Sequence, residues 1–278
     1  MIVRRVRLAM ATRFDFWLAG DDEEHLRAVG EAALDEVARI ERLLSRFDPA
    51  SEVSRLNREA ALHPVRVDRE LFGILRDALD WSGRTDGYFD PCATGEPRAS
   101  RMREAIRLDE SRQAVSFLDP ATRLDLGAYG KGYALDVAAR VLDEFGVGSA
   151  LLDGGASSIL ARGRPEDAPT WRVELLGIGP GESASAVELL DAALSTSATF
   201  DPGSDLSDIV DPVASRRLDE RASCSVVAPS ATEAEVYSTA LLAMGRDRAG
   251  EFLRRMDRPA SALRVFWTGR EGFEVLEG

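Results

Sequence analysis

The chain has 278 residues, of which 45% are hydrophobic and 30% charged, and its formal net charge is -13. This balance is typical of a globular protein and excludes a disordered, collagenous or coiled-coil chain. An acidic chain without a basic run repels phosphates, so we expect no nucleic acid partner. No stretch reaches the ~20 apolar residues that span a bilayer, and the N-terminus does not resemble a secretory leader.

Two details of the composition bear on chemistry. Two cysteines and two histidines without a CxxC pair cannot supply a zinc site built from Cys and His. Of the 35 basic residues, Lys131 is the single lysine. A lysine kept among so many arginines indicates a position that needs a compact ammonium, the alternative being survival by chance.

The first third of the chain has clear hydrophobic periodicity. Residues 2–8 and 13–19 alternate, which predicts two strands joined by a tight turn. Apolar residues recur every three or four positions from 21 to 44, which predicts a long amphipathic helix. A short helix is expected to begin at Ser51, and another helix is expected over 68–81.

The rest of the chain mixes short strands and helices without regular βαβ alternation. This pattern favours an α+β fold of mixed, mainly antiparallel strands packed with helices, and no linker or repeat divides residues 1–278, so we expect a single domain. The predicted elements are a glycine-rich turn at 127–132, helices at 133–145, 233–244 and 247–256, and strands at 114–118, 123–126, 150–152, 157–160, 171–176, 186–190, 192–196 and 223–228, with further strands closing the chain.

Eight segments, taken in order, resemble the FAD:protein FMN transferases of the ApbE type. They are AMATRF (9–14), LSRFDPASEVSRLN (44–57), DGYFDP (86–91), LDLGAYGKGYALD (124–136), ALLDGGASSILARG (150–163), LSTSA (194–198), DIVDP (208–212) and SVVAPSATEAEVYSTALLAMG (225–245). The resemblance implies that the protein binds FAD and Mg²⁺ and moves FMN to a Thr or Ser hydroxyl of an acceptor protein, with release of AMP.

Members of the family are often exported lipoproteins. This chain shows neither a signal peptide nor an N-terminal lipid-acceptor cysteine. We therefore expect a cytoplasmic protein, unless a leader has been removed.

The resemblance also implies a metal site, made by the Ala128 carbonyl, Glu235 and Thr239. A spacing of four places Glu235 and Thr239 on one helical face, where two oxygen ligands reach one hard cation. The acid is usually aspartate in the family, and a glutamate reaches one methylene further. The alternative is an exposed glutamate beside a buried threonine.

Further positions match residues that contact FAD in the family. Phe47 stands where a tyrosine that stacks on the flavin is common, and the ammonium of Lys131 is suited to a phosphate. Ordinary core packing is the alternative for the aromatic residues. The positions are Met10, Phe47, Tyr88, Phe89, Asp90, Asp125, Lys131 and Val210.

The base position departs from the family pattern. Asp208 stands where most members have a histidine, and Ala214 and Ser215 replace the usual Thr-Gly. Asp208 is therefore the expected acceptor for the proton of the attacking hydroxyl. Three hypotheses stay open: an active transferase with an exchanged base, a non-catalytic FAD-binding paralogue, and a structural or regulatory protein without flavin.

Overall fold

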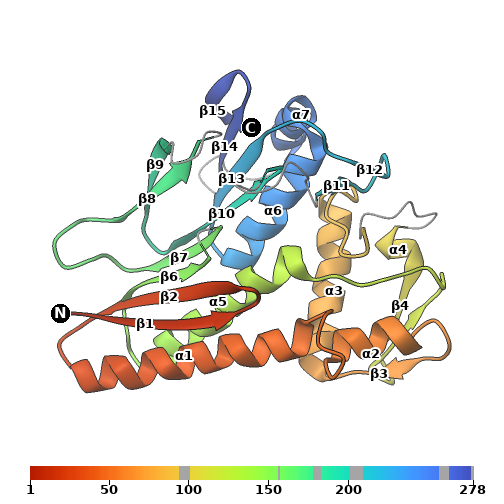
Figure 1. Cartoon of the computed structure of the whole chain (residues 1–278), viewed down its shortest axis with the longest axis horizontal. Helices are drawn as coiled ribbons and strands as arrows, with labels where there is room; N and C mark the ends of the chain where they lie inside the picture. The colour runs from red at the N-terminus through yellow and green to blue at the C-terminus, as the bar shows by residue number, and fades with distance from the viewer. Residues whose placement is uncertain (94–100, 156, 178–182, 201–208, 257–262, 277–278) are drawn as a thin grey trace.

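The computed structural model describes residues 1–93, 101–155, 157–177, 183–200, 209–256 and 263–276 (Figure 1). The helices are α1 (Glu23–Leu44), α2 (Glu52–Glu59), α3 (Arg69–Arg84), α4 (Met102–Ala105), α5 (Gly127–Glu144), α6 (Ala231–Met244) and α7 (Arg246–Arg255). The strands are β1 (Ile2–Ala9), β2 (Thr12–Ala19), β3 (Val65–Arg66), β4 (Ile106–Asp109), β5 (Ala114–Phe117), β6 (Ser149–Gly154), β7 (Ser158–Arg162), β8 (Trp171–Leu176), β9 (Ser183–Leu189), β10 (Ala192–Ala198), β11 (Val210–Asp211), β12 (Arg216–Arg217), β13 (Ser223–Ala228), β14 (Arg264–Gly269) and β15 (Gly272–Leu276).

The largest sheet has eight strands in the order β1-β2-β6-β7-β10-β13-β14-β15. Smaller sheets are formed by β3-β5-β4, β8-β9 and β11-β12. Every strand pair among the described residues is antiparallel. The predicted α+β class, with mainly antiparallel strands packed with helices, is therefore confirmed.

The N-terminal hairpin and α1 follow the predicted pattern. Met10 and Ala11 have φ values of 51° and 58°, as a two-residue connection between antiparallel strands requires. The Asp22 carboxylate caps α1 by accepting the His25 N–H at 3.0 Å. The apolar stripe of α1 from Leu26 to Leu44 is buried, which confirms the helix that the periodicity predicts.

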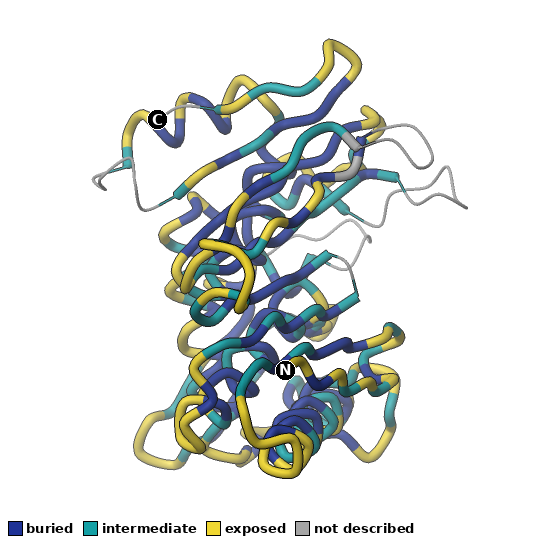
Figure 2. The backbone as a smooth tube through the Cα atoms, turned by 90° about the vertical axis from the view of Figure 1, so that its left-hand side faces the viewer, coloured by how far each residue is buried: buried dark blue, intermediate teal, exposed yellow. Residues whose placement is uncertain are grey.

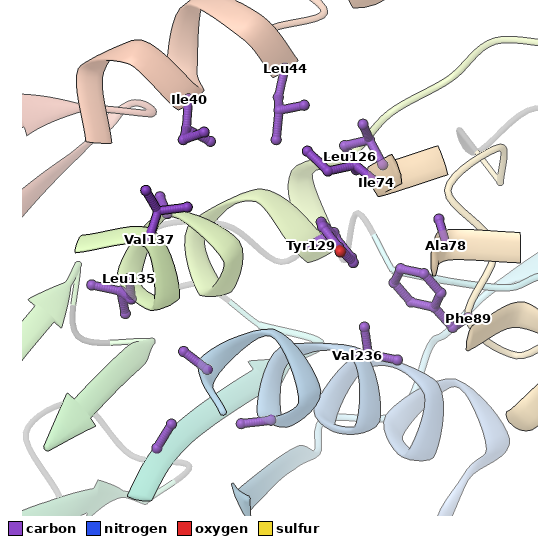
Figure 3. Packing of buried hydrophobic residues seen from close by; sticks show 14 of the residues in the cluster. Ile40, Leu44, Ile74, Ala78, Phe89, Leu126, Tyr129, Leu135, Val137 and Val236 are labelled. Carbon is purple, nitrogen blue, oxygen red and sulfur yellow. The ribbon is translucent and has the colours of Figure 1, made fainter. Parts of the chain in front are cut away.

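Helix α5 lies at the centre of the fold, between α1 and α6 (Figure 3). It packs with α6 on one face of the large sheet, while the β8-β9 hairpin covers the other face of β7, β10 and β13. Strand β13 is buried at every position, and Figure 2 shows the buried segments running through the middle of the sheet. The junction of α5, α6 and the sheet is thus enclosed on several sides.

The predicted strand at 123–126 is wrong, because the structure describes this segment as irregular backbone. The Leu124 N–H donates to Asn57 Oδ1 at 2.7 Å, and the Leu124 carbonyl accepts from Asn57 Nδ2 at 2.9 Å. The Asp125 N–H donates to the Pro91 carbonyl at 2.7 Å. The backbone therefore finds its partners in a side chain and a loop instead of a neighbouring strand.

The predicted glycine-rich turn at 127–132 is also wrong, because α5 already begins at Gly127. None of the three glycines in this segment has a positive φ, so a left-handed backbone conformation does not explain why they are glycine. A Cβ on Gly132 would lie 2.4 Å from the Ala231 carbonyl oxygen. Gly132 thus permits a close contact between α5 and α6.

Five short elements have no counterpart in the predicted set. They have two to four residues each, which is too few for a hydrophobic period to be visible. They are α4, β3, β4, β11 and β12. Among the helices of the described residues, none has the length and apolar character needed to cross a membrane.

Candidate functional site

A cavity of about 450 Å³ opens where segments far apart in the sequence meet. Its walls come from the loop after α3, the start of α5, strand β10, residues 209–212 and helix α6. A volume of this order is typical of small-molecule and cofactor sites. The lining residues are Tyr88, Phe89, Asp90, Pro91, Ala93, Asp125, Gly127, Ala128, Lys131, Ser157, Ser195, Thr196, Ser197, Ile209, Val210, Pro212, Glu235 and Thr239.

Glu235 brings a buried carboxylate to the wall of this cavity, with only 3% of the residue exposed. Its Oε1 atom lies 3.0 Å from Lys131 Nζ, and its Oε2 atom accepts the Gly132 N–H at 2.5 Å. A carboxylate is costly to bury unless it is paired and hydrogen-bonded, and both oxygens of Glu235 have a partner. The site therefore holds one anionic and one cationic group in direct contact.

Asp136 fixes the beginning of α6 against α5. One carboxylate oxygen accepts the Ala231 N–H at 2.8 Å, and the other accepts the N–H and the hydroxyl of Thr232 at 2.9 and 2.6 Å. The Ser230 hydroxyl accepts the Glu233 N–H at 3.1 Å as the cap of the same helix. These contacts satisfy N–H groups of the first turn and set the orientation in which the next turn presents Glu235 to α5.

We expect Asp136→Ala to lower the free energy of unfolding by about 2 kcal/mol, because backbone donors of α6 lose a charged acceptor. The measurement is urea denaturation followed by circular dichroism. A suitable control is Asp143→Ala, which lies in α5 like Asp136. Its exposed carboxylate is 3.5 Å from Arg162, and the loss of this contact should cost about 0.5 kcal/mol or less. Equal midpoints for the two variants would contradict the role given to Asp136.

Ala128 interrupts the first turn of α5 within the same wall. Its φ and ψ of -86° and 16° depart from helical values. In a regular helix the Gly132 N–H would donate to the Ala128 carbonyl, whereas here it donates to Glu235. The Ala128 carbonyl, on the same cavity wall as Glu235, thus departs from the regular pattern of helical hydrogen bonds.

Hydroxyl groups from β10 hold the next turn of α6. Ser197 Oγ lies 2.9 Å from Ser238 Oγ and 3.0 Å from Thr239 Oγ1. The Ser238 hydroxyl also donates to Ser195 Oγ at 3.2 Å. This network anchors Thr239 one turn after Glu235, with both residues on the cavity wall.

Ala128, Glu235 and Thr239 together form a set of oxygen donors on the cavity wall. The described part of the chain contains no group of three or more His, Cys, Asp or Glu side chains that could hold a metal. At these three residues a cation would be bound by one carboxylate and neutral oxygens, with water and a ligand as further partners. Such a set suits Mg²⁺, which favours oxygen, often keeps several waters and is commonly shared with phosphates.

The aromatic residues at the cavity are largely buried: Tyr88 is 6% exposed and Phe89 1%. The Phe89 ring lies 6.4 Å from that of Tyr129, which stacks on Tyr133 at 5.7 Å. Burial raises the pKa of Tyr129 far above its usual range, and burial together with the nearby Glu70 raises the pKa of Tyr133 to about 12. Both phenols stay protonated at neutral pH and are excluded as general bases there.

The family of the chain follows from comparison with known proteins. A model of the ApbE family matches residues 10–263, which is most of the chain. The chain belongs to the ApbE family. The segments that form the cavity wall lie within the matched range.

Curated relatives are transferases. The FAD:protein FMN transferase of Escherichia coli K12 is 25% identical in an alignment that covers 92% of this chain and 82% of the relative. The Treponema pallidum enzyme of the same name is 28% identical and covers 80% of this chain and 74% of the relative. The chain is therefore a member of a family of transferase enzymes.

Solved ApbE structures share the fold. The Thermotoga maritima ApbE protein superposes with a TM-score of 0.86 at 20% identity and covers 99% of this chain and 97% of its own. The flavin transferase ApbE from Vibrio cholerae gives a TM-score of 0.81 at 22% identity and covers 100% and 97%. At this identity the likeness supports the ApbE fold and says nothing of individual side chains.

Nine of the residues predicted for the ApbE site line the cavity: Tyr88, Phe89, Asp90, Asp125, Ala128, Lys131, Val210, Glu235 and Thr239. Asp90 also has a structural task, because its two carboxylate oxygens accept the N–H groups of Cys92 and Met102 at 2.8 and 3.0 Å. The predicted base, Asp208, lies outside the described residues.

Met10 and Phe47 are not among the residues that line the cavity. Met10 lies in the β1-β2 turn, where its N–H donates to Glu41 Oε1 at 2.5 Å. Phe47 is 79% exposed, which excludes the alternative of core packing for this residue. The Arg46 guanidinium covers the Phe47 ring at 4.3 Å and pairs with Asp125 Oδ2 at 2.9 Å, so Phe47 stands near the cavity through Asp125.

Sequence reasoning missed several residues of this candidate site and its surroundings. Ser195, Thr196 and Ser197 line the cavity, and their signal was the run of hydroxyl residues in LSTSA, which was quoted only as a match to the family. Asp136 and Gly132 had no local signal, since their roles arise from the contact between α5 and α6.

Proposed function

We propose that this protein is an FAD:protein FMN transferase that uses Mg²⁺ and moves FMN from FAD to a Thr or Ser hydroxyl of an acceptor protein, with release of AMP. The observation that carries the proposal is the cavity in which Lys131 and the oxygen set of Ala128, Glu235 and Thr239 meet. Family membership and the names of the relatives support the reaction class. The proposal also keeps residues 1–278 as a single flavin transferase domain acting in the cytoplasm.

The reaction is a displacement at phosphorus. The acceptor oxygen forms a bond to the phosphorus on the FMN side of the pyrophosphate, and the bond from that phosphorus to the bridging oxygen breaks. AMP leaves with the bridging oxygen, and the hydroxyl proton passes to a base. Such a step needs cationic groups beside the phosphoryl oxygens and fixed placement of the dinucleotide.

The residues of the cavity fit these needs. Glu235, Thr239 and the Ala128 carbonyl would hold Mg²⁺, which when bound neutralises charge on the phosphoryl oxygens. The ammonium of Lys131 would bind a phosphate oxygen, which its position on the cavity wall supports. Asp208 would accept the hydroxyl proton, a role that rests on the family resemblance alone.

The test is incubation of the purified chain with FAD and Mg²⁺, with and without a Thr-containing acceptor protein, followed by chromatography for AMP and mass spectrometry of the acceptor. We expect AMP together with an acceptor heavier by an FMN group. Tight FAD binding without either product would contradict the transferase and favour the non-catalytic paralogue. Absence of FAD binding would contradict both.

A further inference from the structure

We propose that the ion pair with Lys131 prevents Glu235 from binding a divalent cation until a phosphate of FAD replaces Glu235 as the partner of the ammonium. Lys131 is thus an internal competitor of the cation and a sensor of bound substrate. The inference deepens the function proposed above and rests on it for the cation and for FAD.

The first observation is that the carboxylate of Glu235 is fully engaged. Lys131 Nζ lies 3.0 Å from one oxygen, and the Gly132 N–H lies 2.5 Å from the other. The residue is 3% exposed, so solvent screens this pair poorly. A divalent cation that binds Glu235 must therefore displace or approach an ammonium of the same sign.

The second observation is that the cation has few other anchors. Within the described residues no group of three or more His, Cys, Asp or Glu side chains could hold a metal. Thr239 and the backbone at Ala128 supply neutral oxygens only. The other two carboxylates of the cavity wall are already engaged, Asp90 by two backbone N–H groups and Asp125 by Arg46, so the affinity of the free protein for a cation depends mainly on Glu235.

The third observation is that the ammonium has more room to move than the carboxylate, since the Lys131 side chain is the more exposed of the two. The side chain of Lys131 is 25% exposed and lines the cavity, on a stem with rotatable bonds. Glu235 is held by α5 and α6 in close contact, where a Cβ on Gly132 would lie 2.4 Å from the Ala231 carbonyl oxygen. A phosphate in the cavity offers the ammonium a new partner and leaves Glu235 facing the cation.

The consequence is a positive coupling between FAD and the cation. Whatever FAD does to the affinity for the cation, the cation must do to the affinity for FAD by the same factor. Removing the ammonium should therefore have opposite effects on the two ligands. A residue with a merely structural role would weaken both.

The experiment measures Mn²⁺ binding to the full chain without FAD, from the electron paramagnetic resonance signal of free Mn²⁺. We expect Lys131→Met to bind Mn²⁺ about tenfold more tightly than the parent, because a buried carboxylate loses its counter-charge. In a buffer without divalent cations, the same variant should bind FAD about tenfold more weakly by flavin fluorescence, since a charge-assisted contact is lost. Lys131→Gln should change both affinities in the same directions, which guards against a packing effect peculiar to methionine.

Two controls complete the design. Lys131→Arg keeps the charge and should leave the Mn²⁺ affinity close to that of the parent. Arg140→Ala removes one positive charge from an exposed position further along α5, and we expect less than about a twofold effect on Mn²⁺ affinity because solvent screens it. Thermal unfolding of each variant reports whether the fold is kept.

Unchanged or weaker Mn²⁺ binding by folded Lys131→Met and Lys131→Gln overturns the inference. If Glu235→Gln nevertheless abolishes Mn²⁺ binding, the cation site of the proposed function stands without the competition. If neither the parent nor any variant binds Mn²⁺, either alone or with FAD present, both the inference and that cation site fail.

Discussion

Replacing Glu235 with glutamine is expected to lower the rate of AMP release by about 10²-fold or more, because a bound metal supplies several kcal/mol of charge stabilisation in the transition state. Glutamine keeps the shape of the side chain and an oxygen for the Gly132 N–H. Lys131 loses its anionic partner and becomes available to a phosphate of FAD. The affinity for FAD should therefore be kept or increased while turnover collapses.

The measurement pairs a chromatographic assay of AMP with an FAD titration in a buffer without divalent cations. Glu233→Gln is the matched control, since it makes the same chemical change two residues earlier in α6, outside the cavity lining. AMP release by Glu235→Gln at the rate of this control would contradict the assignment of Glu235 as the metal-binding carboxylate.

The second large effect concerns the contact between α5 and α6. Gly132→Ala is expected to lower the free energy of unfolding by about 2–3 kcal/mol, because the new methyl group meets backbone that cannot move aside cheaply. The Ala231 carbonyl oxygen would lie 2.4 Å from the added Cβ. Separation of the helices would also move Glu235 relative to Lys131, so FAD binding should weaken in parallel.

Gly73 in α3 provides the matched comparison. Apart from the adjacent residues and the backbone of its own helix, no atom lies within 4 Å of a Cβ added there, and the residue is inside the helix. Gly73→Ala should therefore raise the free energy of unfolding by about 0.5–1 kcal/mol. Guanidinium denaturation of both variants decides the matter, and a Gly132→Ala variant as stable as the parent would show that the helices adjust without cost.

Elements with a long hydrophobic period were predictable from the sequence. Helix α1 repeats its apolar residues over 22 positions, and β1 and β2 alternate on either side of a tight turn. The start of α5 was not predictable, because local rules assign three glycines in six residues to a turn. Only the neighbouring α6 explains why Gly132 is glycine.

Some residues of the candidate site were likewise predictable from the sequence, and others were not. The family resemblance named Glu235 and Thr239, and their spacing put them on one helical face, whereas Lys131 was marked by composition alone. The hydrogen bonds of Asp136 to the start of α6 and the hydroxyl contacts of Ser197 join segments far apart in the chain, so no local pattern could predict them. Family resemblance named positions but could not indicate that Asp90 holds its own loop.

The hydrogen bond from Gly132 to Glu235 spans 103 residues of sequence. Domains generally fold as units, in order from the N-terminus as the chain is synthesised. A nascent chain that ends before α6 lacks Glu235, Thr239 and the acceptor for the Gly132 N–H. The cavity therefore cannot form until most of the chain has emerged from the ribosome, and any ligand of the cavity can bind only after α6 has been synthesised.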